Sequence, residues 1–168
     1  MKERDVDMSA KIVNVYKKNL PVLRLIGKRC MCDPHDFITT WDEWLNKGWF
    51  DQLEKLGAAP ENEDMYLGVT ANNGGYWIGL LFPPDTVAPD GFEYVEVPAA
   101  QYAVCVFEGK KDKELLNEDG INLVVEEIGK CGLTPVSLWS AWCIERYSRP
   151  FSQDGKGKTL IDCLYEIQ

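Results

Sequence analysis

Apolar and polar residues alternate along several stretches of the chain, and this period of two predicts β-strands whose side chains point to opposite faces of a sheet. Together with one stretch that is apolar throughout, residues 75–83, the expected strands are residues 12–16, 20–32, 64–70, 75–83, 92–97, 101–109, 136–148 and 159–167. Between the third and the fourth of them, the sequence Asn72-Asn73-Gly74-Gly75 favours the tight turn of a hairpin. We therefore expect a structure dominated by strands, with residues 64–83 folded as a hairpin.

The second arm of that hairpin is apolar on both faces. Its alternating residues are Tyr76, Ile78, Leu80 and Phe82 on one face and Trp77, Gly79 and Leu81 on the other. A strand of this kind either lies in the middle of a sheet that is covered on both sides or turns one face toward a ligand. Its aromatic residues are therefore candidates for a binding site as well as for the core.

Residues 36–56 have apolar side chains at steps of three and four, which is the spacing of an amphipathic helix. These positions are Ile38, Trp41, Leu45, Trp49, Leu53 and Leu56. We expect Trp41 and Trp49 to pack in the core. Gly48 lies within the expected helix, where glycine costs about 1 kcal/mol relative to alanine.

A second helix is expected over residues 112–131, where Gly120 interrupts the apolar pattern. Taken in order, a strand–helix–strand–strand unit then occurs twice, in about residues 1–98 and 99–168, with one linking strand between the units. The two halves share this order of elements and little residue-level similarity. The pattern predicts one α+β domain, residues 1–168, that is built from two pseudo-repeats.

The segment 138–147, LWSAWCIERY, combines a strand pattern with an unusual charge. Its alternation places Glu145 on the same face as Trp139, Cys143 and Tyr147. A buried carboxylate is unfavourable unless it is paired, and this face carries no lysine or arginine within the strand. Either Glu145 points to water or to a lysine elsewhere, or it lies at the floor of an aromatic pocket, where it would hold or act on a cationic ligand.

Composition narrows the classes of function. The chain has 168 residues and a net charge of −9, so nucleic acid is not an expected partner, and no basic helix or helix-turn-helix pattern offsets this charge. No apolar run is long enough to cross a membrane, and the charged N-terminus does not resemble a signal peptide. We expect a cytoplasmic protein that does not bind membranes.

The cysteine and histidine pattern does not favour a metal site. Cys30, Cys32 and His35 give too few ligands at an unsuitable spacing for structural zinc. The six cysteines are expected to be reduced thiols, and several lie in apolar runs. His35 is the only histidine, and no nucleophile motif accompanies it, so we expect no metal and no cofactor.

The second half of the chain resembles the GyrI-like effector-binding family, which also forms the C-terminal domain of multidrug-responsive regulators of the MerR and AraC types. The resemblance rests on Val97-Pro98-Ala99 followed by Tyr102-Ala103-Val104, a helix, the Glu145-Arg146-Tyr147 strand, a loop and a final strand. The first half matches in element order and in the helix segment WDEWLNKGWF, residues 41–50. The resemblance implies a duplicated strand–helix–strand–strand fold with a curved, mostly antiparallel sheet, two long helices and a ligand pocket near its middle.

The same resemblance implies which side chains form the pocket. The acidic residue that meets lipophilic cations in multidrug-binding relatives aligns with Glu145. The aromatic candidates are Trp139, Tyr147, Trp77, Tyr76 and Phe82, followed by Tyr94 and Tyr165. The resemblance covers no DNA-binding domain, so this chain is expected to act as a stand-alone binding domain.

Several functions remain open at this point. The first is a binding protein for aromatic, cationic, lipophilic compounds. The second is a hydrolase that uses Glu145 to position water against reactive cyclopropane-bearing aromatic compounds, as the resemblance implies for some stand-alone family members. An acidic adaptor whose aromatic residues are all core is a third, and haem binding is disfavoured by the single histidine. The sequence does not decide the oligomeric state.

Overall fold

The structure is a computed structural model, and it describes residues 11–30, 37–57, 66–71, 75–109, 118–136, 142–147 and 159–168. The strands are β1 (Lys11–Leu20), β2 (Leu23–Cys30), β3 (Tyr66–Thr70), β4 (Tyr76–Phe82), β5 (Glu93–Val97), β6 (Ala100–Gly109), β7 (Cys143–Tyr147) and β8 (Thr159–Glu166). The helices are α1 (Phe37–Lys47), α2 (Trp49–Glu54) and α4 (Glu118–Lys130).

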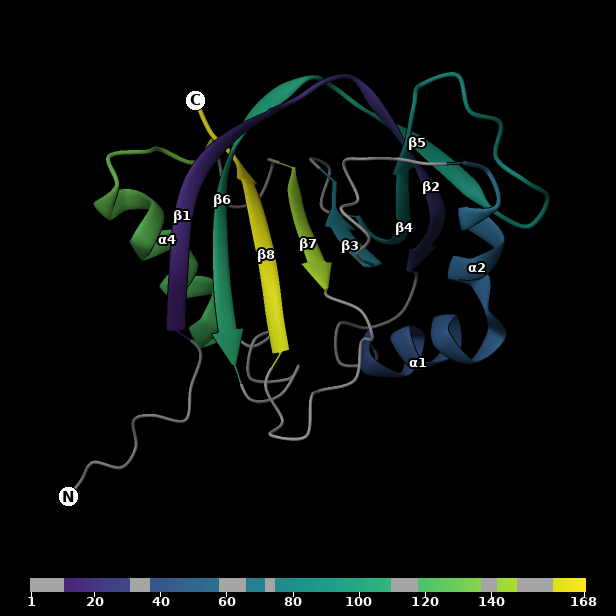
Figure 1. Cartoon of the computed structure of the whole chain (residues 1–168), viewed down its shortest axis with the longest axis horizontal. Helices are drawn as coiled ribbons and strands as arrows, with labels where there is room; N and C mark the ends of the chain where they lie inside the picture. The colour runs from purple at the N-terminus through teal and green to yellow at the C-terminus, as the bar shows by residue number, and fades with distance from the viewer. Residues whose placement is uncertain are drawn as a thin grey trace.

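The described strands form one curved sheet in the order β1-β6-β8-β7-β3-β4-β2-β5, in which all neighbours are antiparallel. Figure 1 shows this sheet as an arch, with α4 beside β1 and β6 and with α1 and α2 near β2 and β4 at the other end. The predicted α+β class with its duplicated order of elements is confirmed. β3 and β7 pair in the middle of the sheet, so the two sequence halves meet there.

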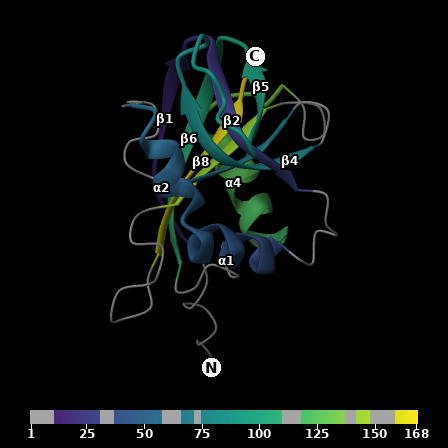
Figure 2. The same cartoon turned by 90° about the vertical axis from the view of Figure 1, so that its right-hand side faces the viewer.

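The helices cover one face of the sheet. Direct strand partners place Cys105, Cys163, Glu145, Gly68 and Ile78 in one row across β6, β8, β7, β3 and β4, so their side-chain positions share a face. The thiol of Cys105 contacts the carbonyl of Val124 on α4. Trp41 of α1 contacts Tyr147, which lies two residues from Glu145. In Figure 2, α1 and α4 both lie beneath the strands.

The opposite face of the sheet is also buried. Its fully buried residues include Leu25, Leu67, Val69, Val104 and Ile144. Buried side chains on both faces explain why the strand at 75–83 was apolar throughout. β4 lies between β3 and β2, in the interior of the sheet, as that pattern predicted.

A buried ion pair joins β7 and β8 on that opposite face. Arg146 and Asp162 are direct strand partners, and their Nη2 and Oδ2 atoms are 2.7 Å apart. Removing one member of such a pair would leave an uncompensated charge in the core, at a cost of about 3–5 kcal/mol. The ion pair of Arg146, the residue after Glu145, therefore holds β7 to β8 on the face opposite to Glu145.

The segment predicted as one helix over residues 36–56 is two helices. Gly48 adopts φ 67° and ψ 29°, in the left-handed region, and it ends α1 and begins α2. Trp49, expected in the core, is half-buried and packs against the core from its edge. The change of direction at Gly48 accounts for this position, because it breaks the single helical period on which the prediction rested. Trp44, within α1, is almost fully buried among the rings of Trp49, Phe50 and Phe92.

The predicted second helix is present as α4, and the part of residues 112–131 that precedes Glu118 lies outside the described residues. Gly120 lies inside α4 and does not interrupt it. The strand predicted at residues 12–16 is longer than expected and forms β1, which lies at one edge of the sheet beside β6. The hairpin prediction is confirmed by the pairing of β3 with β4.

Candidate functional site

Glu145 lies in the middle of β7, at the centre of the sheet, with Gly68 of β3 and Cys163 of β8 as its strand partners. Its side chain is half-buried. The hydroxyl of Tyr147 donates a hydrogen bond of 2.9 Å to Oε1 of Glu145, and the hydroxyl of Tyr76 lies close enough to influence the pKa of the carboxyl. Two phenols from different strands therefore lie beside the carboxylate.

Burial disfavours the charged form of Glu145, and this charge in turn raises the pKa of neighbouring groups. Burial raises the pKa of this carboxyl above its ordinary range, and the hydroxyls of Tyr147 and Tyr76 offset part of this shift. Burial and the nearby carboxylate also raise the pKa of both phenols. None of the ion pairs in the described part of the chain includes Glu145.

A glycine makes room for the second phenol. A Cβ atom at Gly68 would collide with the hydroxyl of Tyr76 and would lie 3.1 Å from the ring of Trp41. Gly68 is the direct strand partner of Glu145, so the space above this glycine is the space through which the Tyr76 hydroxyl reaches the carboxylate. Any larger residue at position 68 would force Tyr76 away.

Trp41 of α1 closes the cluster from the helix side. Its indole Nε1 donates a hydrogen bond of 3.2 Å to the Tyr76 hydroxyl. Its ring meets the ring of Tyr147 edge-on, with centroids 4.9 Å apart. We call Glu145, Tyr76, Tyr147 and Trp41 the Glu145 cluster.

More aromatic side chains continue from this cluster. Phe50 of α2 lies 5.9 Å from Trp41 and stacks on Tyr66 of β3 with centroids 4.0 Å apart. Tyr66 is the strand partner of Tyr147. The cluster is thus one end of an aromatic layer that links the middle of the sheet to α1 and α2.

The structure brings together three of the aromatic candidates with Glu145. Tyr147 bonds the carboxylate directly, and Tyr76 lies beside it. Tyr165 of β8 is the partner of Cys143 across the strands, and its raised pKa arises from burial and from the charges of neighbours that include Glu145. All three lie on the helix-covered face.

The other candidates lie apart from the carboxylate. Trp77 follows Tyr76 on β4, so its side chain is on the opposite face of the sheet. Phe82 shares the face of Glu145 but is buried at the far end of β4, where Arg24 is its strand partner. Tyr94 lies on the edge strand β5, is 53% exposed, and has the guanidinium of Arg24 4.3 Å from its ring. Trp139 lies outside the described residues.

Sequence reasoning missed the contribution of Trp41 and Gly68. Trp41 fits the apolar stripe of α1, and a tryptophan on such a stripe is normally a core residue, as this one also is at 3% exposure. Nothing in the sequence near Gly68 indicates that Tyr76, eight residues further along the chain, needs its space. Both roles depend on the packing of α1 against β3, β4 and β7.

The thiols near Glu145 are poor nucleophiles. Cys143 and Cys163 flank the carboxylate on β7 and β8, and burial followed by the charge of Glu145 raises the pKa of both thiols. Since only the thiolate is an effective nucleophile or metal ligand, this surrounding keeps them in the neutral form. The described residues contain no group of three or more His, Cys, Asp or Glu side chains that could hold a metal ion.

Taken together, the Glu145 cluster can hold a positive charge or move a proton. It offers a half-buried carboxylate, two phenol hydroxyls and an indole ring within one aromatic layer.

Among the helices that the structure describes, none is both long and apolar enough to cross a membrane.

Comparison with known proteins identifies solved structures that share the fold of this chain. No protein-family model and no curated protein matches the sequence. Among solved structures, SAV2435 bound to tetraphenylphosphonium is 16% identical over 93% of this chain and 94% of that chain, with a TM-score of 0.67. A putative bacterial transcription regulation protein from Staphylococcus aureus MU50 is 15% identical over 92% of this chain and 98% of that chain, with a TM-score of 0.61.

The C-terminal domain of EcmrR is a third similar structure, 10% identical over 92% of this chain and 97% of that chain, with a TM-score of 0.61. At these identities the comparisons establish a shared fold. They confirm the fold that the resemblance to the GyrI-like effector-binding family implied, over nearly the whole chain.

Proposed function

We propose that this protein binds aromatic, lipophilic cations and that Glu145 supplies the counter-charge. The observation that carries the proposal is the partner set of this carboxylate. It is half-buried, accepts a hydrogen bond from Tyr147 and lies beside Tyr76, and no basic side chain forms an ion pair with it among the described residues. A carboxylate in such a position is stabilised by a cation that brings its own apolar surface.

The surrounding rings suit the body of such a ligand. A delocalised cation over an aromatic face gains about 0.5–2 kcal/mol per good contact. Trp41, Tyr76 and Tyr147 present rings beside the carboxylate, and Tyr66 is half-buried next to them. We assign Tyr165 to a further wall of the same site, since strand pairing puts it on the face of Glu145. The alternation of the sequence predicts the same face for Trp139, which lies outside the described residues.

A structural neighbour supports the chemical class of the ligand. SAV2435, which shares this fold, has been solved with tetraphenylphosphonium bound. That compound is a singly charged cation with four phenyl rings, and its combination of charge and aromatic surface matches the combination offered by the Glu145 cluster. We extend the ligand class, and not the particular compound, to this chain.

The decisive experiment compares ligands of one shape and opposite charge. Tetraphenylphosphonium and tetraphenylborate differ mainly in charge, and calorimetric titration of the full chain with each measures the preference. We expect the wild type to favour the cation. Glu145→Gln should weaken cation binding about tenfold or more, the loss expected for removing one charge partner from a partly desolvated site.

Glu126→Gln is the matched control, because Glu126 is an exposed carboxylate on α4 and its replacement changes the net charge by the same amount. It should leave both affinities unchanged. Equal cation affinities in wild type and Glu145→Gln, with both variants folded by circular dichroism, would refute the proposal. A similar loss in Glu126→Gln would instead attribute the preference to overall charge.

The raised pKa of Glu145 also supports a second candidate, a hydrolase. A glutamate shifted toward neutral pH is suited to act as a general acid or base. In this alternative Glu145 positions water against a reactive cyclopropane-bearing aromatic compound held by the rings. Mass spectrometry of such a compound after incubation would show a product heavier by one water with wild type and not with Glu145→Gln. Unchanged substrate in both samples would exclude hydrolysis of that compound.

A further inference from the structure

A cavity lies on the helix-covered side of the sheet and borders the Glu145 cluster, because its lining residue Cys30 is the direct strand partner of Tyr76. It has a volume of about 400 Å³ and is formed by β2, α1 and the start of α2. None of the four residues of the Glu145 cluster lines it. Lys28 is in the same row across the sheet as Glu145, with β3 and β4 between their strands. Three strand spacings put these positions about 14 Å apart.

Lys28 gives this cavity a positive charge. Its ammonium Nζ donates a hydrogen bond of 2.7 Å to the carbonyl of Gly91. It also lies 4.3 Å from the ring centroid of Trp49 and 5.0 Å from that of Phe92. None of the ion pairs within the described residues includes Lys28. An ammonium has three N–H donors, so the described contacts leave it able to bind an anion.

The acidic residue of the cavity does not neutralise this charge. Glu43 lines the cavity, but its Oε2 is 2.9 Å from Nζ of Lys47, one turn further along α1. Lys47 itself lies 5.1 Å from the ring of Trp49. Two ammonium groups therefore lie beside the Trp49 ring, and Glu43, the acidic residue among those that line the cavity, is already paired with Lys47.

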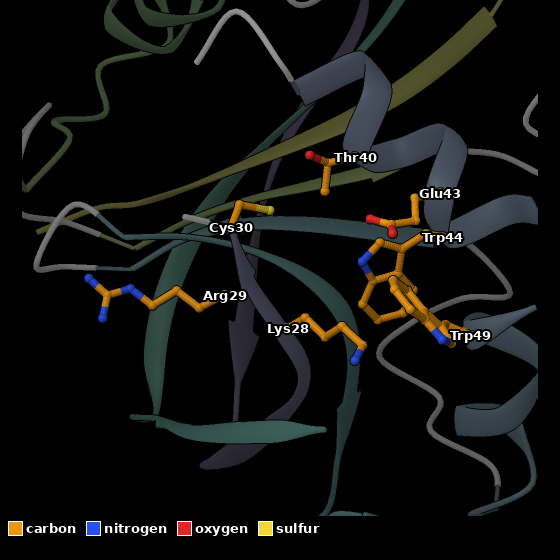
Figure 3. A pocket seen from close by; sticks show the side chains of 7 residues that line it. All are labelled: Lys28, Arg29, Cys30, Thr40, Glu43, Trp44 and Trp49. Carbon is orange, nitrogen blue, oxygen red and sulfur yellow. The ribbon is translucent and has the colours of Figure 1, made fainter. Parts of the chain in front are cut away.

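The remaining wall is aromatic and partly fixed. Trp44 is almost fully buried, and the ring of Trp49 meets it edge-on with centroids 5.3 Å apart. Figure 3 shows these two rings side by side with Lys28 pointing toward them from β2, whereas the guanidinium of Arg29 points away. Burial of Trp44 holds one aromatic surface in place, and the cavity opens beside it.

We propose that the Lys28 end of this cavity is a binding site, distinct from the Glu145 carboxylate, for a planar aromatic compound that carries one carboxylate group. The carboxylate bonds the Lys28 ammonium, and the ring system packs against Trp44 and Trp49. The charge selectivity of this site is opposite to that proposed for the Glu145 cluster. The protein would then bind an aromatic anion and an aromatic cation at two places on one face of its sheet.

Titration calorimetry with 2-naphthoate and its neutral counterpart 2-naphthalenemethanol tests this site in the full chain. We expect wild type to bind the anion more tightly. Lys28→Met keeps the apolar stem against Trp49 and Phe92 and removes the charge, so naphthoate affinity should fall about tenfold or more. Lys28→Arg keeps the charge and should retain binding. The matched control is Lys130→Met, an exposed lysine of α4 that is paired with Glu127.

Glu145→Gln separates this proposal from the previous one. It should leave naphthoate affinity unchanged within about twofold, even where it weakens binding of tetraphenylphosphonium. The second site would be overturned by absence of naphthoate binding to wild type, by equal affinity in a folded Lys28→Met variant, or by loss of binding in Glu145→Gln. The last result would place the anion in the Glu145 cluster. Loss of tetraphenylphosphonium binding in Glu145→Gln, with naphthoate binding retained, would support the Lys28 site.

Discussion

Glu145 keeps a charged group in a place where the folded protein disfavours the charge. Its pKa is raised because burial removes water from the carboxylate, and the hydroxyls of Tyr147 and Tyr76 replace that water only in part. Gly68 and Trp41 keep Tyr76 in position for this role. The site is thus prepared for a positive charge that would relieve an existing unfavourable burial.

The first prediction concerns the pH dependence of stability. Because the folded-state pKa of Glu145 lies above the unfolded value of about 4.3, its contribution is present below that pH and is lost as pH rises through the folded pKa. Glutamine does not ionise, so in Glu145→Gln this loss of stability with rising pH does not occur. We expect the free energy of unfolding of the variant, relative to wild type, to increase as pH rises above about 4.3 and then to level off.

Urea unfolding of both proteins from acidic to slightly alkaline pH measures this difference without ligand. Glu126→Gln on α4 serves as the control and should give a difference that does not follow the same curve. A Glu145→Gln difference that is independent of pH, or that falls as pH rises, would show that the carboxylate is not disfavoured by folding.

Among the elements, the α1–α2 corner depends on one backbone conformation. Gly48 at φ 67° turns the chain so that α1 places Trp41 on the sheet and α2 places Phe50 against Tyr66. A residue with a Cβ atom pays about 1–2 kcal/mol in this left-handed conformation. In an uninterrupted helix, alanine would instead be favoured over glycine by about 1 kcal/mol.

The second prediction tests whether alanine at position 48 lowers or raises the free energy of unfolding. Gly48→Ala should lower the free energy of unfolding by about 1–2 kcal/mol, measured by denaturant titration. Steric clash is not the cause, since a Cβ atom there would meet only the carboxylate of Asp51 at 3.9 Å. Gly129→Ala is the matched control, because Gly129 lies inside α4 with open space around it. It should stabilise by about 0.5–1 kcal/mol, and stabilisation by both would indicate a continuous first helix.

At the scale of the whole molecule, strand pairs tie the two sequence halves together. β1 from the first half pairs with β6 of the second, and β3 pairs with β7 in the middle of the sheet. The Glu145 cluster itself takes Tyr76 and Trp41 from the first half and Glu145 and Tyr147 from the second. Neither half can complete its sheet or this cluster alone.

The third prediction is that residues 1–168 unfold as one cooperative unit. Four of the six tryptophans lie in residues 1–98, so intrinsic fluorescence reports mainly on the first half, whereas far-ultraviolet circular dichroism reports on both. The two denaturation curves should coincide, with equal midpoints and slopes. Separate midpoints would show that the halves are independent domains, and adding tetraphenylphosphonium should shift both curves together if the proposed cation site spans them.

How far the fold could be predicted varied with the range of the interactions. The hairpin of β3 and β4, the edge strand β1 and the strand carrying Glu145 follow from local alternation and turn residues, and they are present. The single helix over residues 36–56 was wrong because apolar spacing alone cannot show a left-handed glycine. Trp49 changed from a core residue to the wall of a cavity for the same reason.

By itself, the sequence determined the class of the fold, the face of the strand on which Glu145 lies, and the acidic, aromatic composition that favours small cations over nucleic acid. These follow from period, charge and residue type, which are properties of neighbours along the chain. Only the tertiary structure decided that Tyr147 bonds the carboxylate with Tyr76 beside it, that Trp77 turns to the other face, and that Lys28 borders a cavity. Those facts depend on strand register and helix placement, which arise from contacts between segments far apart in sequence.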